Sequence, residues 1–214
     1  MYWLNNHYNF VFAGGSCGSF VKTIWNFYNA YIYNNQIINR HYKVDYKVVP
    51  KIKLHVNETT GDAHDNIMCY QQFHDHNVLH VKNNDPDKKI ILIMFDHDDI
   101  DLITKLQYFK FNKPWLENNL DLAKSLYPAI ADGLSDPARC EETWREHLKQ
   151  GYQHWLKHVD SENADFIIDF KTIYRESDKN LNQIISSYLK TDTRPEVDSY
   201  INKYRQINYK LYGE

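Results

Sequence analysis

Four short apolar runs along the chain are typical of buried β-strands. The clearest run is KKIILIMF, residues 88–95, because a continuous apolar segment fits a strand in a sheet that is covered on both faces. Shorter runs predict three further strands over residues 9–14, 67–74 and 164–170. The four runs are far apart in the chain, so longer elements must connect them.

Apolar residues recur every three or four positions in most of the connecting segments, which predicts helices. The predicted helices cover residues 19–33, about 98–111, 115–134, 137–159, 178–190 and 195–211. Buried strands that alternate with helices are typical of an α/β protein with three layers and a central, mostly parallel sheet. No linker divides the chain, and we expect a single domain over residues 1–214 with a helical part at about 114–159.

Composition narrows the class of protein. Hydrophobic residues make up 43% of the 214 positions, and the net charge is −3 without a long basic run, which argues against a dedicated nucleic-acid-binding protein. Three widely spaced cysteines, Cys17, Cys69 and Cys140, indicate a reducing compartment. The N-terminus lacks a basic leader and no apolar run approaches a membrane span, so we expect a cytoplasmic protein with no membrane partner.

The segment NFVFAGGSCGSFVKTIW, residues 9–25, reads as a buried strand, a sharp glycine-rich turn and the start of a helix. Glycines let the backbone approach a ligand closely, and the amides at a helix N-terminus favour an anion. The nearest lysine is Lys22, one turn into the helix, which argues against a magnesium-dependent nucleotide hydrolase. Two interpretations stay open: a phosphate-binding loop, or glycines that only permit a tight turn. Cys17 is more typical of a small packed residue than of a nucleophile.

Three stretches together resemble the P-loop sulfotransferases. Residues 10–25 resemble the 5′-phosphosulfate loop of that family, residues 86–111 its 3′-phosphate segment, and residues 164–189 its late strand and the helix after it. In the first stretch the family's proline, basic residue, small residue, glycine and two hydroxyl residues fall, in order, on Gly15, Ser16, Cys17, Gly18, Ser19 and Phe20. The resemblance covers about half of the chain.

The resemblance implies a P-loop sulfotransferase-like fold and a function. The protein would transfer a sulfuryl group from 3′-phosphoadenosine 5′-phosphosulfate to a hydroxyl or amine of a small-molecule or glycan acceptor, without a metal. Residues 15–20 and Thr104 would bind this donor. Two alternatives are a non-catalytic nucleotide- or anion-binding protein of the same fold, and a small-molecule or nucleotide kinase.

The chain departs from the family pattern at two basic positions. Ser16 stands where the loop carries a basic residue, and Phe95 stands where an arginine would hold the 3′-phosphate. The family's serine falls near Ile103, with Thr104 adjacent. The candidate lysines that would replace the missing charges are Lys22, Lys88, Lys89 and Lys105.

Histidines supply the candidate base. The resemblance places His74 where the family has the histidine that takes the proton from the acceptor, and a near-neutral pKa suits that task. The alternatives are His76, a histidine that only ends a strand, and a metal site. On the predicted helix, His147, His154 and His158 have a spacing that can hold a metal, but they flank an apolar stripe and fit a solvated boundary better. We therefore predict His74 as the catalytic base and no metal.

Overall fold

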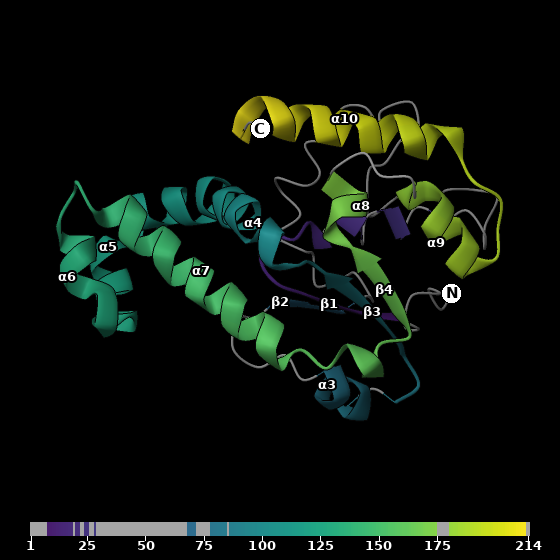
Figure 1. Cartoon of the computed structure of the whole chain (residues 1–214), viewed down its shortest axis with the longest axis horizontal. Helices are drawn as coiled ribbons and strands as arrows, with labels where there is room; N and C mark the ends of the chain where they lie inside the picture. Colours follow the sequence, from purple (N-terminus) through teal and green to yellow (C-terminus); the bar gives the residue numbers. More distant parts are fainter. Residues whose placement is uncertain are drawn as a thin grey trace.

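The computed structural model describes residues 8–18, 20, 21, 24, 25, 28, 68–71, 78–84, 86–174 and 180–212. Its sheet contains the strands β1 Tyr8–Phe12, β2 Met68–Gln71, β3 Lys89–Met94 and β4 Phe166–Asp169. The strand order is β2-β1-β3-β4, and every neighbouring pair is parallel (Figure 1). The expected α/β class is confirmed, and β1 pairs with β3, the strand that KKIILIMF forms.

Helices make up most of the described chain. The α-helices are α3 Val78–Asn84, α4 Ile100–Gln107, α5 Lys113–Leu126, α6 Ala131–Ser135, α7 Cys140–His158, α8 Phe170–Tyr174, α9 Leu181–Leu189 and α10 Pro195–Tyr212. Short 3-10 segments are η3 His97–Asp99, η5 Pro128–Ile130 and η6 Ser161–Asn163, and η4 Tyr108–Asn112 is a π-helix. The described residues between 18 and 28 are also helical. No helix in the described part of the chain is both long enough and apolar enough to cross a membrane.

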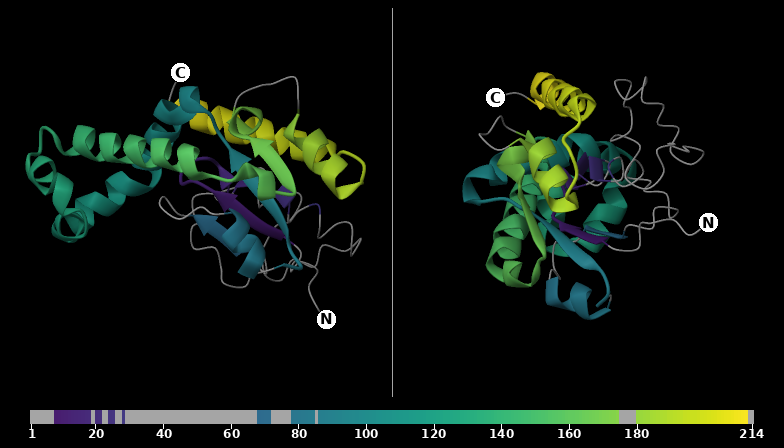
Figure 2. Two further views of the ribbon diagram at one scale, coloured as in Figure 1. Left: turned by 60° about the horizontal axis from the view of Figure 1, so that its bottom comes forward. Right: turned by 90° about the vertical axis from the view of Figure 1, so that its right-hand side faces the viewer.

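Helices cover both faces of the sheet (Figure 2). On one face the helix that follows β1 packs with α9 and α10. Its Trp25 ring lies 5.9 Å from the ring of Phe10 and 6.3 Å from the ring of Tyr188. On the other face lie α3 and the end of α7, which are tied together where the Val78 amide donates to Asp160. This sandwich buries β1 and β3 on both sides, as their apolar sequences require.

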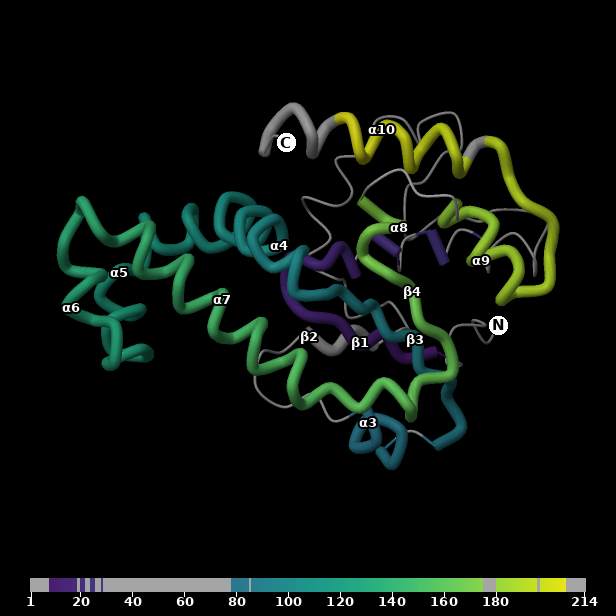
Figure 3. The backbone as a smooth tube through the Cα atoms, viewed as in Figure 1, coloured from purple at the N-terminus to yellow at the C-terminus, as the bar shows by residue number. Residues whose placement is uncertain are grey.

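The helical part extends away from the sheet. In Figure 3 the backbone of α5, α6 and α7 projects to one side, while α8, α9 and α10 stay close to the strands. The predicted helix over residues 115–134 is divided into α5, η5 and α6. The division falls at Pro128, whose ring forces Tyr127 out of the helical region (φ −125°, ψ 64°). The helix α7 begins at Cys140 and not at the predicted residue 137, because the residues just before it form a turn.

Candidate functional site

The strand order changes direction at β1. From β1 the chain continues to β2 on one side, whereas β3 lies on the other side of β1 and leads on to β4. In open α/β sheets, ligands bind outside the carboxyl ends of strands at such a switch in strand order. The segment that leaves β1 at this point is residues 13–18, here called the glycine loop.

Two residues of the glycine loop have left-handed backbone conformations. Gly15 has φ +81° and Cys17 has φ +64°. Between them, the amide and the hydroxyl of Ser16 both donate to the carbonyl oxygen of Ala13, at 3.2 and 2.6 Å. The Val21 amide donates to the Cys17 carbonyl, which starts the helix. The hydroxyl of Ser16, predicted as a ligand contact, is thus engaged inside the turn, and its side chain is buried.

The glycines of the loop also allow close packing. A Cβ atom at Gly15 would lie 2.7 Å from the carbonyl oxygen of Ile103, on α4. At Gly18 a Cβ atom would run into the ring of Phe12. Both glycines are therefore required by the fold, whatever the loop binds.

Two buried side-chain oxygens on α4, Oγ1 of one residue and Oε1 of another, have no hydrogen-bond partner in the described part of the chain. These residues are Thr104, which is fully buried, and Gln107, which is 7% exposed. The Gln107 carboxamide lies against Gly14, since a Cβ atom there would be 3.0 Å from Oε1 and 3.2 Å from Nε2. Buried polar groups are almost always paired, so these two call for an explanation. Thr104 was predicted as a site residue, whereas Gln107 was missed.

Cys17 is covered by the C-terminal helix. The hydroxyl of Tyr204, on α10, donates to Cys17 Sγ at 3.1 Å, and the Tyr204 ring stacks on Phe20 with a centroid distance of 3.7 Å. The ammonium of Lys110 lies 5.3 Å from the centroid of the same ring. Burial raises the pKa of the Cys17 thiol, although Lys110 and the Tyr204 hydroxyl act in the opposite direction. Cys17 is thus a packed, neutral thiol, and Phe20 is part of the core.

A second tyrosine holds the loop from the other side. Tyr152, on α7, is fully buried and donates its hydroxyl to the carbonyl oxygen of Gly14 at 2.6 Å. Phe95 stacks on Trp155, with ring centroids 5.0 Å apart, and meets the Tyr152 ring edge to face at 5.7 Å. The position where the resemblance expects an arginine is therefore filled by an aromatic core contact.

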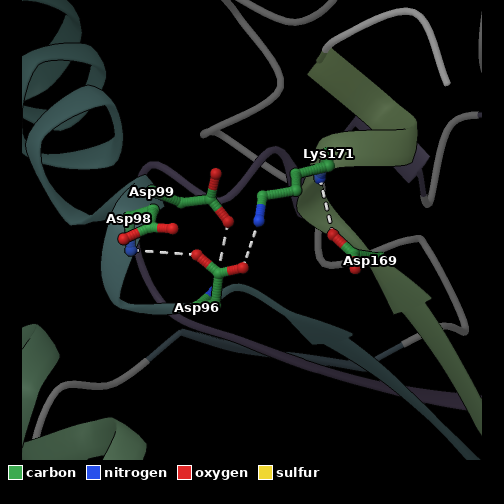
Figure 4. Close-up of polar contacts among 5 residues, drawn as sticks. All are labelled: Asp96, Asp98, Asp99, Asp169 and Lys171. Atoms are coloured by element: carbon green, nitrogen blue, oxygen red, sulfur yellow. Dashed lines mark hydrogen bonds and ion pairs between the residues drawn. The ribbon is translucent and has the colours of Figure 1, made fainter.

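Charged residues gather at the carboxyl ends of β3 and β4 (Figure 4). Asp96 accepts from the Asp98 amide at 2.9 Å, and Asp99 accepts from the Asp96 amide at 3.1 Å, which together form a capping box at the start of η3. Lys171, on α8, forms an ion pair with Asp96, and the Lys171 amide donates to Asp169 at 2.8 Å. The hydrogen bond from Lys171 lowers the pKa of Asp96 below its ordinary value. The segment DHDD, residues 96–99, thus caps the 3-10 turn that leads into α4.

The remaining predicted site residues are distributed as follows. His74, His76, Ser19 and Lys22 lie outside the described residues. The last residue of β2, Gln71, pairs with Phe12, so the chain leaves β2 at the same edge as the glycine loop. Lys89, at the start of β3, lies 5.5 Å from the Phe166 ring centroid, at the amino edge of the sheet. With about 3.3 Å per residue, β3 separates Lys89 from the carboxyl edge by nearly 20 Å.

The histidines of α7 pack against aromatic rings and one another. The rings of His154 and His158 lie 4.3 Å apart, and His147 lies 5.0 Å from the Tyr127 ring. Across the described ranges, no group of three His, Cys, Asp or Glu side chains is placed to hold a metal ion.

Comparison of the chain with protein-family models, with curated protein sequences and with solved structures finds no match. The chemistry of the site must therefore be argued from its own residues.

Proposed function

We propose that the protein binds the phosphosulfate end of 3′-phosphoadenosine 5′-phosphosulfate at the glycine loop and transfers the sulfuryl group to an acceptor hydroxyl or amine. One observation carries the proposal: the glycine loop leaves β1 at the carboxyl edge, beside the switch in strand order, and leads directly into a helix. A strand, a glycine turn and a helix in this arrangement favour an anion at the helix N-terminus.

The backbone of the loop supports this proposal. Left-handed conformations at Gly15 and Cys17 bend the loop sharply. The Ser16 amide donates to Ala13, and we propose that other amides of the loop turn toward an anion. Such amides are fixed before a ligand arrives, so they stabilise charge on a transferring sulfuryl group without reorganisation. The aromatic and aliphatic residues around the loop keep its surroundings apolar, which strengthens these interactions.

The transfer itself needs a base. As the acceptor oxygen bonds to sulfur, the bond from sulfur to the phosphate oxygen breaks, 3′-phosphoadenosine 5′-phosphate leaves, and the acceptor loses a proton. We propose His74 for that proton, because β2 ends three residues earlier, at the edge where the glycine loop lies.

A non-catalytic binder of the same class of ligand is the second candidate. It is favoured by the two positions at which cations are expected, since the Ser16 hydroxyl bonds within its own turn and Phe95 stacks on Trp155. A protein that lost these charges would keep the loop and lose the transfer reaction.

Calorimetry on the full chain tests the proposal and separates the candidates. We expect 3′-phosphoadenosine 5′-phosphate to bind more tightly than ATP, and Mg²⁺ to leave its affinity unchanged. Failure of 3′-phosphoadenosine 5′-phosphate to bind would overturn both candidates. Binding without sulfuryl transfer to any of a panel of phenols, alcohols, amines and glycans would favour the non-catalytic binder.

A further inference from the structure

A positive charge lies near the glycine loop at a position that the family resemblance does not indicate. Lys110 belongs to η4, the π-helical turn that follows α4. Its ammonium lies 5.3 Å from the centroid of the Tyr204 ring, whose hydroxyl reaches Cys17 Sγ at 3.1 Å. The Tyr204 side chain thus connects Lys110 to the middle of the glycine loop. Lys110 is half-buried, and its charge lowers the pKa of the Cys17 thiol, in opposition to the effect of burial.

The π-helical turn is itself informative. A π-turn inserts one residue into a helix, which changes the direction of the side chains that follow, and such turns are frequent at functional sites. In η4 the turn runs from Tyr108 to Asn112, with Lys110 at its centre.

Gln107 provides an independent observation that points to a ligand. It lies three residues before Lys110, its side chain is 7% exposed, and its carboxamide packs on Gly14 of the loop. Oε1 has no partner within the described ranges. A carboxamide presents its oxygen or, after a half-turn, its nitrogen, so it can donate to an anion. Burial of an unpaired amide oxygen is costly, and a bound molecule that forms a hydrogen bond with the carboxamide would remove that cost.

We propose that Lys110 and Gln107 bind the anionic end of the ligand in the glycine loop and so replace the basic residues that are absent at Ser16 and Phe95. This inference rests on the proposed function, and it identifies the residues that hold the phosphosulfate group. Lys110 supplies charge, and Gln107 supplies a directed hydrogen bond. Lys89 lies at the opposite edge of the sheet, and Lys171 is paired with Asp96, so neither takes this role.

A matched pair of lysines makes the test specific. Lys113 also lies over an aromatic ring, that of Phe109 at 5.7 Å, and it follows Lys110 by three residues. We expect Lys110→Met to weaken binding of 3′-phosphoadenosine 5′-phosphate by about tenfold to a hundredfold, the range for hydrogen bonds to charged groups. Lys110→Arg should restore most of that loss, whereas Lys113→Met should change affinity by less than about twofold, as is usual for exposed charges.

Gln107→Leu gives a second test that does not depend on charge. It should weaken binding of 3′-phosphoadenosine 5′-phosphate and of inorganic sulfate by about fivefold or more, the equivalent of one neutral hydrogen bond. Its thermal midpoint should stay at or above that of the wild type, because the Gln107 Oε1 atom makes no hydrogen bond to the described residues.

The outcomes are distinguishable. If the wild type binds neither 3′-phosphoadenosine 5′-phosphate nor sulfate, the proposed function and this inference both fall. If the wild type binds but Lys110→Met and Gln107→Leu bind equally well, this inference alone is overturned. It is also overturned if Lys110→Arg loses as much affinity as Lys110→Met. Should Lys110→Met not fold, Lys110→Arg and Gln107→Leu decide the question.

Discussion

Two turns leave the carboxyl edge of the sheet and start helices, but they differ in charge and in the residues that contact them. In the aspartate turn, residues 96–99 after β3, the side chains of Asp96 and Asp99 accept hydrogen bonds from backbone amides of the same turn. Lys171 forms an ion pair with Asp96. The glycine loop after β1 has no charged side chain. It is surrounded by aromatic rings, and the carboxamide of Gln107 beside it has no partner in the described part of the chain.

The comparison shows why the most charged part of the edge is not the best candidate site. The carboxylates of the aspartate turn accept from amides of the same turn and from Lys171, so the turn offers an anion acceptors and not donors. A turn beside a buried, unpaired amide gains a hydrogen bond when a ligand arrives. The difference is testable. Substitutions in the aspartate turn should change the free energy of unfolding and leave ligand affinity unchanged. Around the glycine loop, some substitutions should change ligand affinity without lowering the free energy of unfolding.

The largest effect is expected at Gly18. Gly18→Val places two methyl groups against the Phe12 ring, and overpacking of this kind should lower the free energy of unfolding by about 3 kcal/mol or more. Gly15→Ala should cost about 1–3 kcal/mol because of its left-handed backbone, and Gly14→Ala should cost less, because it meets only the end of the Gln107 side chain. Denaturant unfolding measures this series.

A double-mutant cycle tests the cause at Gly18. If the Phe12 ring is the obstacle, the variant with both Phe12→Ala and Gly18→Val should be less destabilised than the sum of the single variants. Strict additivity would contradict this account. Because Gly18→Val should damage the fold, loss of ligand binding in that variant would say nothing about an anion site.

An intermediate effect is expected at Tyr152. Tyr152→Phe removes the buried hydrogen bond to the Gly14 carbonyl and should lower the free energy of unfolding by about 1–3 kcal/mol, since the acceptor is left unpaired. Tyr188 makes the same type of bond, to the Ile167 carbonyl at 3.0 Å, in an exposed position. Tyr188→Phe should therefore cost less, about 0.5 kcal/mol, because water replaces the donor. Equal losses in the two variants would show that the glycine loop is not held more firmly than the surface.

A smaller effect is expected in the aspartate turn. The pKa of Asp96 is lower in the fold than its ordinary value of 3.8. The charge of Asp96 therefore stabilises the fold at pH values above 3.8, and this contribution disappears as the pH falls through the folded-state pKa. Asp96→Asn keeps a capping side chain and removes the charge, so it should cost less than about 1 kcal/mol at pH 7, as exposed ion pairs do.

The pH dependence gives the sign of the Asp96 effect. The difference between wild type and Asp96→Asn in unfolding free energy should be constant from pH 5 to pH 7 and shrink below about pH 4. Added salt should also reduce it. A difference that grows in acid would be incompatible with the ion pair to Lys171.

Much of the fold follows from local sequence. The run at residues 88–95 predicted β3 because both of its faces are buried, and the predicted helix at 195–211 matches α10 within one residue. The helix α3 was missed because only Val78 and Val81 in its seven residues are buried, which is too short for a helical pattern. The π-turn η4 was missed because its aromatic residues continue the helical pattern of α4 without interruption.

Less of the candidate site follows from sequence. Glycines mark the loop, because a strand-to-helix turn with left-handed residues needs them. The side chains that surround it come from distant parts of the chain: Tyr204 is 187 residues from Cys17, and Tyr152 is 138 residues from Gly14. Their approach depends on how α7 and α10 pack, which no local pattern contains. Gln107 alone left a signal, as a polar residue next to the buried Leu106 and Tyr108.

The smallest effect on stability, and the sharpest contrast with the aspartate turn, is expected at Thr104. Its Oγ1 atom is buried and has no partner among the described residues, so Thr104→Val removes a hydroxyl that the described fold does not use. The free energy of unfolding should stay the same or rise by up to about 1 kcal/mol. Thr104→Ser is the matched control: it keeps the hydroxyl, loses a buried methyl group and should cost about 1 kcal/mol. If Thr104 contacts the ligand, as the family resemblance implies, affinity for 3′-phosphoadenosine 5′-phosphate should rank in the opposite order, with the serine variant binding better than the valine variant. Calorimetry beside denaturant unfolding checks both rankings. A valine variant that is destabilised by more than about 1.5 kcal/mol would show that the Thr104 hydroxyl stabilises the fold. Thr104 would then have a structural role, as Asp96 and Asp99 have in the aspartate turn.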